Sequence, residues 1–141
     1  MSSVTILIAV FKGDPLDYIS CRHTGIVLEY DGQQRILHIT GARGFFTFQE
    51  ELRAVKVENS RRLAADGIVN VARIPARDID LFRTIVANTH INNEEERWNC
   101  QNFVGDALAR AVKAHLISNK QFLDAIDNMA TVLAEATDIE P

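Results

Sequence analysis

The spacing of hydrophobic residues changes near Pro75, and this change constrains the fold more than any other feature of the sequence. Before Pro75, apolar residues form short runs or alternate with polar ones, a spacing that predicts β-strands. The expected strands cover residues 4–11, 23–30, 35–39, 55–58 and 68–74. After Pro75, apolar residues recur every three or four positions, which predicts helices over about 77–89, 100–116 and 119–133. We therefore expect an α+β fold, with an antiparallel sheet of about five strands packed against about three helices.

Length and composition limit the remaining possibilities. The 141 residues, 47% of them hydrophobic, suit a single domain over residues 1–141. The formal net charge is −4 and the basic residues are not clustered, which argues against nucleic acid and anionic membrane surfaces as partners. The run 4–11 has no preceding Lys or Arg and no small-residue cleavage site, so it predicts a buried strand and not a signal peptide or transmembrane segment. Oligomeric state stays open.

The cysteines point to a reducing compartment. Two cysteines without a metal-ligand spacing predict free thiols in a cytoplasmic protein. We expect neither a metal nor a cofactor.

Cys100 is the first candidate for chemistry. Asn99 is a favourable N-cap residue, and the apolar stripe that follows predicts a helix, so Cys100 lies in the first turn. The N–H groups and dipole at a helix N-terminus favour the thiolate, which is the nucleophilic form. The alternative is a structural cysteine, because Cys100 also belongs to the core-facing stripe of the helix.

His23 is the candidate base. It opens a strand that leads into Asp31-Gly32, a strong hairpin signal. A strand histidine beside a cysteine at a helix N-terminus can accept the thiol proton and later return it to a leaving group. We expect the Cys100 sulfur to lie within hydrogen-bond reach of the nearer ring nitrogen of His23, or one small side-chain rotation from it, at about 3–5 Å. Cys21 shares the predicted strand face of His23 and is the rival nucleophile.

The two segments resemble a circularly permuted papain-like fold of the NlpC/P60 superfamily, in which histidine precedes cysteine. The order of His23, Leu37-His38-Ile39 and the helix start at 99–104 is similar to the lecithin:retinol acyltransferase-like branch. The His23-Thr24-Gly25-Ile26 strand and the same helix start also resemble the PPPDE peptidases. Gln101 and Asn102 differ from the Glu-His pair of the acyltransferases, and the glycine-rich segment expected of PPPDE peptidases is shortened to 41–44.

The resemblance implies a third catalytic group, for which His38 is the candidate. If the turn is centred on Gly32-Gln33, Val27 pairs with His38, and both lie on the face of His23. Val27 lies four residues from His23, about 13 Å along a strand. Direct contact between the two imidazoles therefore requires a bulge or another register. Asn99 and Gln101 are alternative amides that could orient His23 or stabilise an oxyanion.

The segment 40–48 is expected to be a loop that shapes a binding site. Its three phenylalanines, Phe45, Phe46 and Phe48, could line an acyl pocket or simply fill the core. Arg43 could bind a carboxylate.

Two classes of function remain. The first is a cysteine-dependent hydrolase or acyltransferase that acts on an amide, ester or thioester of a small molecule, lipid or peptide through an acyl-enzyme. The second is a catalytically silent papain-like module that binds a small molecule or protein.

Overall fold

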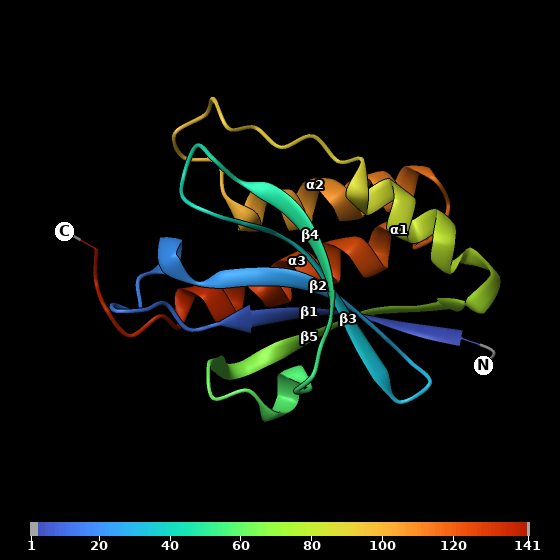
Figure 1. The fold of residues 1–141 in the computed structure, drawn as a ribbon, viewed down its shortest axis with the longest axis horizontal. Helices are drawn as coiled ribbons and strands as arrows, with labels where there is room; N and C mark the ends of the chain where they lie inside the picture. The colour runs from blue at the N-terminus through green and yellow to red at the C-terminus, as the bar shows by residue number, and fades with distance from the viewer. Residues whose placement is uncertain (1–2, 141) are drawn as a thin grey trace.

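Five strands form one antiparallel sheet in the order β4-β3-β2-β1-β5 in the computed structural model, which describes residues 3–140 (Figure 1). The strands are β1 (Ser3–Phe11), β2 (His23–Tyr30), β3 (Gln33–Thr40), β4 (Thr47–Leu52) and β5 (Leu63–Pro75). The helices are α1 (Ile79–Ala87), α2 (Cys100–Lys113) and α3 (Asn119–Ala134), with short 3₁₀ turns η1 (Ile19–Cys21), η2 (Val57–Asn59) and η3 (Ala76–Asp78). The predicted α+β layout of five strands and three helices is therefore confirmed.

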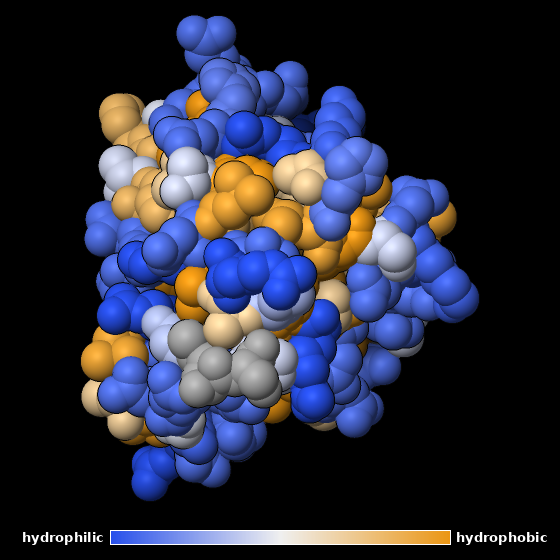
Figure 2. Space-filling model, turned by 90° about the vertical axis from the view of Figure 1, so that its right-hand side faces the viewer, coloured by the Kyte–Doolittle hydropathy of each residue, from blue (hydrophilic) through white to orange (hydrophobic). Residues whose placement is uncertain are grey.

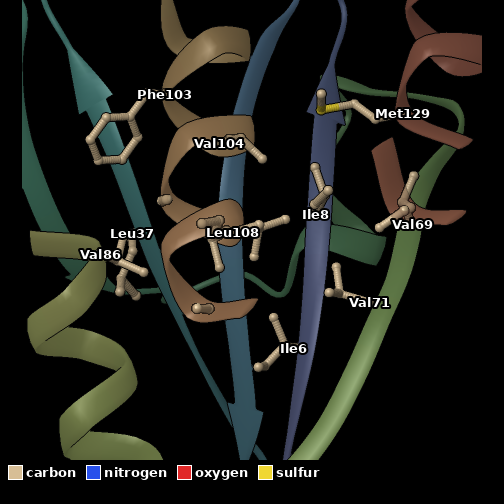
Figure 3. Close-up of a cluster of buried hydrophobic side chains, with 14 of the residues drawn as sticks. Ile6, Ile8, Leu37, Val69, Val71, Val86, Phe103, Val104, Leu108 and Met129 are labelled. Atoms are coloured by element: carbon tan, nitrogen blue, oxygen red, sulfur yellow. The ribbon is translucent and has the colours of Figure 1, made fainter. Parts of the chain in front are cut away.

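Alternating side chains of the sheet form two apolar layers. On one face, Ile6 and Ile8 of β1 lie in the main core with Phe103, Val104 and Leu108 of α2 (Figure 3). On the other face a smaller cluster includes Leu7, Ala9, Phe11, Val27, Ile36 and Val57. The second cluster is closed by Val57, which belongs to the connection between β4 and β5. The sheet is thus buried on both faces, although only one face carries helices.

The β2–β3 hairpin differs from the expected register by two residues. Tyr30 pairs with Gln33, so the turn consists of Asp31 and Gly32, which have φ angles of 52° and 72°. Both angles fit the two-residue turn that matches the twist of a hairpin. Val27 consequently pairs with Ile36 and not with His38.

The predicted strand at 55–58 is wrong, and the fifth strand is β4. Val57 begins the 3₁₀ turn η2, where it is buried and its N–H donates to Gln34 Oε1 at 2.8 Å. β4 falls partly inside the segment expected to be a loop. It forms one edge of the sheet and is largely exposed, so it lacks the apolar alternation by which buried strands are recognised.

The expected helices are present. α1 lies within the predicted range, and α2 begins at Cys100. α3 begins after Ser118, whose side chain and that of Gln121 form the predicted capping box. No helix within residues 3–140 is long and apolar enough to cross a membrane. At the end of the molecule where β1 begins, hydrophobic surface lies near the middle of the face, with hydrophilic residues around it (Figure 2).

Gly25 of β2 provides the space that the hairpin requires. A Cβ at this position would lie 2.7 Å from Ile36 Cδ1 and 3.2 Å from His38 Cβ. We predict that Gly25→Ala lowers the free energy of unfolding by about 1–3 kcal/mol, because the added methyl group overpacks the sheet. Chemical denaturation measures this. The matched control is Gly105→Ala in α2, where the nearest atom would be 3.9 Å away, so stability should be unchanged or increased. Equal effects of the two substitutions would contradict the packing argument.

Candidate active site

The structure brings His23 and His38 into direct contact. His23 begins β2, and His38 lies one residue past Leu37, which pairs with Ile26. This register places His38 level with Gly25, which has no side chain to separate the two rings. His23 Nε2 lies 2.7 Å from His38 Nδ1, and the ring centroids are 5.0 Å apart. The shifted register that direct contact required is therefore present.

Glu51 of β4 lies next to this pair and was not identified from the sequence. Its Oε2 atom is 3.6 Å from His38 Nε2, which has no hydrogen-bond partner among residues 3–140. The carboxylate favours a proton on His38 Nε2. His38 Nδ1 then accepts a hydrogen bond from the Nε2–H of His23, and His23 Nδ1 keeps its lone pair. This arrangement leaves His23 Nδ1 as the proton acceptor of the pair.

The Cys100 thiol is held by the main chain on both sides of His23. Its sulfur accepts a hydrogen bond from the Thr24 N–H at 3.4 Å and donates to the Arg22 carbonyl at 3.8 Å. The residue is only 8% exposed. In the part of the chain that the structure describes, no hydrogen bond joins the thiol to the imidazole of His23. Proton transfer between them therefore requires a side-chain rotation or a bridging water.

Asn99 is the N-cap of α2, as predicted. Its Oδ1 accepts from the Gln101 N–H at 2.9 Å, and its own N–H donates to Asn102 Oδ1 at 3.0 Å. The Cys100 N–H is at the first helical position and has no intrahelical partner. It is therefore available to stabilise an oxyanion beside the sulfur.

The side-chain amide of Gln101 binds the main chain that precedes His23. Its Nε2 donates to the carbonyls of Ile19 at 2.7 Å and Arg22 at 3.1 Å. A side-chain amide has only two N–H bonds, so both are occupied. These contacts leave no free side-chain N–H for an oxyanion, and neither of them is to the imidazole of His23.

Burial keeps both candidate catalytic groups neutral. It raises the pKa of the Cys100 thiol, and the N–H groups of Thr24, Cys100 and Gln101 oppose this only partly. The expectation that the helix terminus lowers this pKa is therefore wrong in its net direction. Burial, with a smaller contribution from His38, lowers the pKa of His23 to about 4. Burial also lowers the pKa of His38, against the opposing effect of Glu51. At neutral pH the site consists of a thiol and uncharged imidazoles.

A cavity of about 310 Å³ lies against the two histidines. Its lining comes from β1, β2, β3 and the connection between β4 and β5, and consists of Phe11, His23, Ile36, His38, Arg53, Ser60 and Arg62. None of the substrate-binding residues predicted from the sequence contributes to this lining.

The predicted binding loop instead attaches to the segment before α2. Phe46 packs against Trp98 and Phe48 against Phe103, with ring centroids 6.4 and 6.1 Å apart, while Phe45 is 78% exposed. These contacts of Phe46 and Phe48 correspond to the core-filling alternative.

Hydrogen bonds complete the attachment of this loop. Asn93 bonds both the N–H and the carbonyl of Phe46, and Arg43 donates to the Glu96 carbonyl. The two loops lie side by side at the end of the molecule where α2 begins (Figure 1). Arg43 therefore supports the loop through a carbonyl contact.

Cys21, the rival nucleophile, lies in η1 and not in a strand. Its thiol is free and the residue is exposed, whereas the free thiol of Cys100 is buried. Within residues 3–140, no group of three or more His, Cys, Asp or Glu side chains is arranged to hold a metal ion.

Comparisons with known proteins give no relative for this chain. No family model matches it, and neither a curated protein nor a solved structure does. The candidate site therefore rests on its own geometry.

The partly buried imidazole of His23 predicts that stability decreases in acid. Its pKa is about 4 in the folded protein, against about 6.5 in the unfolded chain. The unfolded state binds more protons between these values, so the free energy of unfolding falls as the pH falls from about 6.5 to about 4. The expected loss is roughly 2–3 kcal/mol from His23. When urea denaturation is measured at several pH values, the free energy of unfolding should change less steeply with pH in His23→Gln than in the wild-type protein. An unchanged slope would contradict the assigned protonation state.

The cap on α2 should affect both stability and the thiol. We predict that Asn99→Ala lowers the free energy of unfolding by about 1 kcal/mol and raises the pKa of Cys100 further. The measurement is the rate of Cys100 alkylation by iodoacetamide against pH, made in a Cys21→Ala background. Ser118→Ala, which removes the equivalent cap of α3, should cost similar stability but leave the alkylation profile unchanged. An unchanged profile in Asn99→Ala would show that the cap does not act on the thiol.

Proposed function

We propose that this protein is a cysteine-dependent hydrolase or acyltransferase with a circularly permuted papain-like domain of the NlpC/P60 type. The observation that carries the proposal is the hydrogen bond of 2.7 Å between His23 and His38, next to a thiol bound to both main-chain neighbours of His23. Two histidines from adjacent strands and a later cysteine at a helix N-terminus follow the order of residues in this superfamily.

The first half of the reaction forms an acyl-enzyme. When a substrate enters, the Cys100 thiol gives its proton to His23 Nδ1, and the sulfur attacks the carbonyl carbon. The C–S bond forms as the carbonyl π pair moves to oxygen, where the Cys100 N–H stabilises the negative charge. As the tetrahedral intermediate collapses, the bond to the leaving group breaks and His23 returns the proton to that group.

The second half releases the acyl group. Water or another nucleophile loses a proton to His23 and attacks the thioester carbon. The C–S bond then breaks and the proton returns to the Cys100 sulfur. Hydrolysis and acyl transfer differ only in whether water or another nucleophile accepts the acyl group. His38 orients His23 throughout, and the Glu51 carboxylate lies 3.6 Å from His38 Nε2.

Because both groups rest in their neutral forms, this mechanism uses His23 as a general base and not a preformed thiolate–imidazolium pair. The substrate is an amide, ester or thioester of a small molecule, lipid or peptide. We place the protein in the cytoplasm, where two free cysteines remain reduced. A catalytically silent binding module is the second candidate, and the burial and raised pKa of Cys100 favour it.

The decisive variants are Cys100→Ala and His23→Ala. On a panel of fluorogenic thioester, ester and amide substrates, each should lower kcat/KM by about 1000-fold or more, because each removes a reacting group. Thermal unfolding should show that the Cys100→Ala protein still folds. His38→Gln should lose less, because His38 does not touch the reacting atoms. Cys21→Ala is the matched control and should retain activity.

Two outcomes would oppose the proposal. Full activity in Cys100→Ala would overturn the thiol mechanism. A wild-type protein that turns over no panel member, and whose Cys100 forms no acyl adduct detectable by mass spectrometry, would favour the silent binding module.

A further inference from the structure

Arg53 places its guanidinium, which makes two contacts, at the cavity beside the histidines. It follows β4, and its main-chain N–H donates to the Gln34 carbonyl at 2.8 Å. The guanidinium carbon lies 5.7 Å from the centre of the Phe11 ring, and Nε donates to the Val55 carbonyl at 3.1 Å. The face of the Phe11 ring and the hydrogen bond from Nε together define the plane of the guanidinium.

The outer edge of this guanidinium has no partner. Among the residues that the structure describes, the two terminal nitrogens of Arg53 make no hydrogen bond and its charge is in no ion pair. An arginine held in one orientation with its terminal nitrogens free is suited to bind a planar anion.

The other arginine of the cavity is already paired. Arg62 lies 3.7 Å from Asp14, and its other terminal nitrogen donates to the Lys12 carbonyl. Glu51 lies 3.6 Å from His38, which is uncharged at neutral pH, so the carboxylate is not neutralised by the imidazole. Of the two arginines that line the cavity, Arg53 is therefore the one whose terminal nitrogens are free to bind a ligand.

A second polar group in the cavity lacks a hydrogen-bond partner. His38 is only 9% exposed, it lines the cavity, and its Nε2 forms no hydrogen bond in residues 3–140. A buried polar atom without a partner costs free energy, and a bound ligand can remove that cost. The apolar wall formed by Phe11 and Ile36 leaves room for a short carbon chain within about 310 Å³.

We propose that this cavity binds a carboxylate of the acyl substrate through the terminal nitrogens of Arg53. The inference rests on the proposed function, because it places the carboxylate end of the substrate beside His23 while the carbonyl carbon reaches Cys100. The planar fork of Arg53 matches the two oxygens of a carboxylate. The preferred substrates are therefore esters, thioesters or amides that carry a second, free carboxylate.

Binding is tested first without chemistry, in the Cys100→Ala protein. Glutarate is titrated while NMR follows the imidazole resonances of His23 and His38 and the Nε–H of Arg53. We expect saturable shifts of all three residues, at least 10-fold weaker binding of the neutral analogue glutaramide, and at least 10-fold weaker binding of glutarate to Arg53→Gln. Arg53→Lys, which keeps the charge but loses the fork, should also bind glutarate more weakly than the parent. Inorganic phosphate is the competing probe, and tighter binding of phosphate than of glutarate would overturn the assignment to a carboxylate.

A matched control separates a local effect from a change in net charge. Arg77→Gln removes one exposed arginine from η3, next to Pro75, which pairs with Ser3 at the far end of β1 from Phe11. This variant should bind glutarate as the parent does. Equal losses in Arg53→Gln and Arg77→Gln, or no loss in a folded Arg53→Gln protein, would overturn the proposed site.

Turnover distinguishes failure of this site from failure of the proposed function. The wild-type protein should hydrolyse a glutaryl thioester with a kcat/KM at least 10-fold higher than that for a butyryl thioester, mainly because KM is lower. Arg53→Gln should lose this preference. Glutarate binding without turnover of either thioester would retain the site and reject the proposed function. Cys100-dependent turnover without a preference and without glutarate binding would retain the function and reject the site.

Discussion

The buried ion pair between Asp17 and Arg22 is the interaction on which the candidate site depends. Arg22 donates to both carboxylate oxygens of Asp17, at 2.9 and 2.8 Å, and to main-chain carbonyls at the end of α3. Its own carbonyl accepts from the Cys100 thiol and the Gln101 amide. One residue thus joins the start of β2, the start of α2 and the end of α3. Because loss of either charge would leave the other buried and unpaired, at a cost of about 3–5 kcal/mol, this junction has little freedom to shift.

The helices could be predicted from the sequence because their signals are local. Asn99, Ser118 and Gln121 identify where α2 and α3 begin through hydrogen bonds within three residues, and the apolar period identifies their buried faces. The hairpin was predicted for the same reason, but its register was not. Gly32 belongs to both candidate turns, but Asp31-Gly32 is the pair that a two-residue hairpin turn favours, and it places Val27 opposite Ile36 on the second apolar face. A shift of two residues decides whether His23 and His38 touch.

The candidate site was predictable only in part, because several of its members depend on tertiary contacts. Cys100 and His23 occupy element starts, where residue type and position already indicate chemistry. Glu51 and Arg53 come from an edge strand and its end, in a segment that the sequence pattern did not identify as a strand. The apolar stripe of α2 allowed a buried Cys100, but the balance between burial and the helix terminus could not be predicted locally. The field of a helix terminus follows from sequence, whereas the desolvation that opposes it depends on how the helix packs.

The β2–β3 pairing ends before His23. This explains how the Cys100 sulfur, which comes from the helix-bearing side, can lie next to a strand whose histidine is on the other face. Pairing between these strands stops at Ile26 and Leu37, so the amide of Thr24 and the carbonyl of Arg22 are free to bond the thiol of Cys100. Main-chain N–H and C=O groups of a strand point sideways, within the sheet. The sulfur therefore lies beside β2 and not over either face. In the proposed mechanism a substrate carbonyl would bind at this edge of β2, with the rest of the molecule in the cavity lined by His23 and His38.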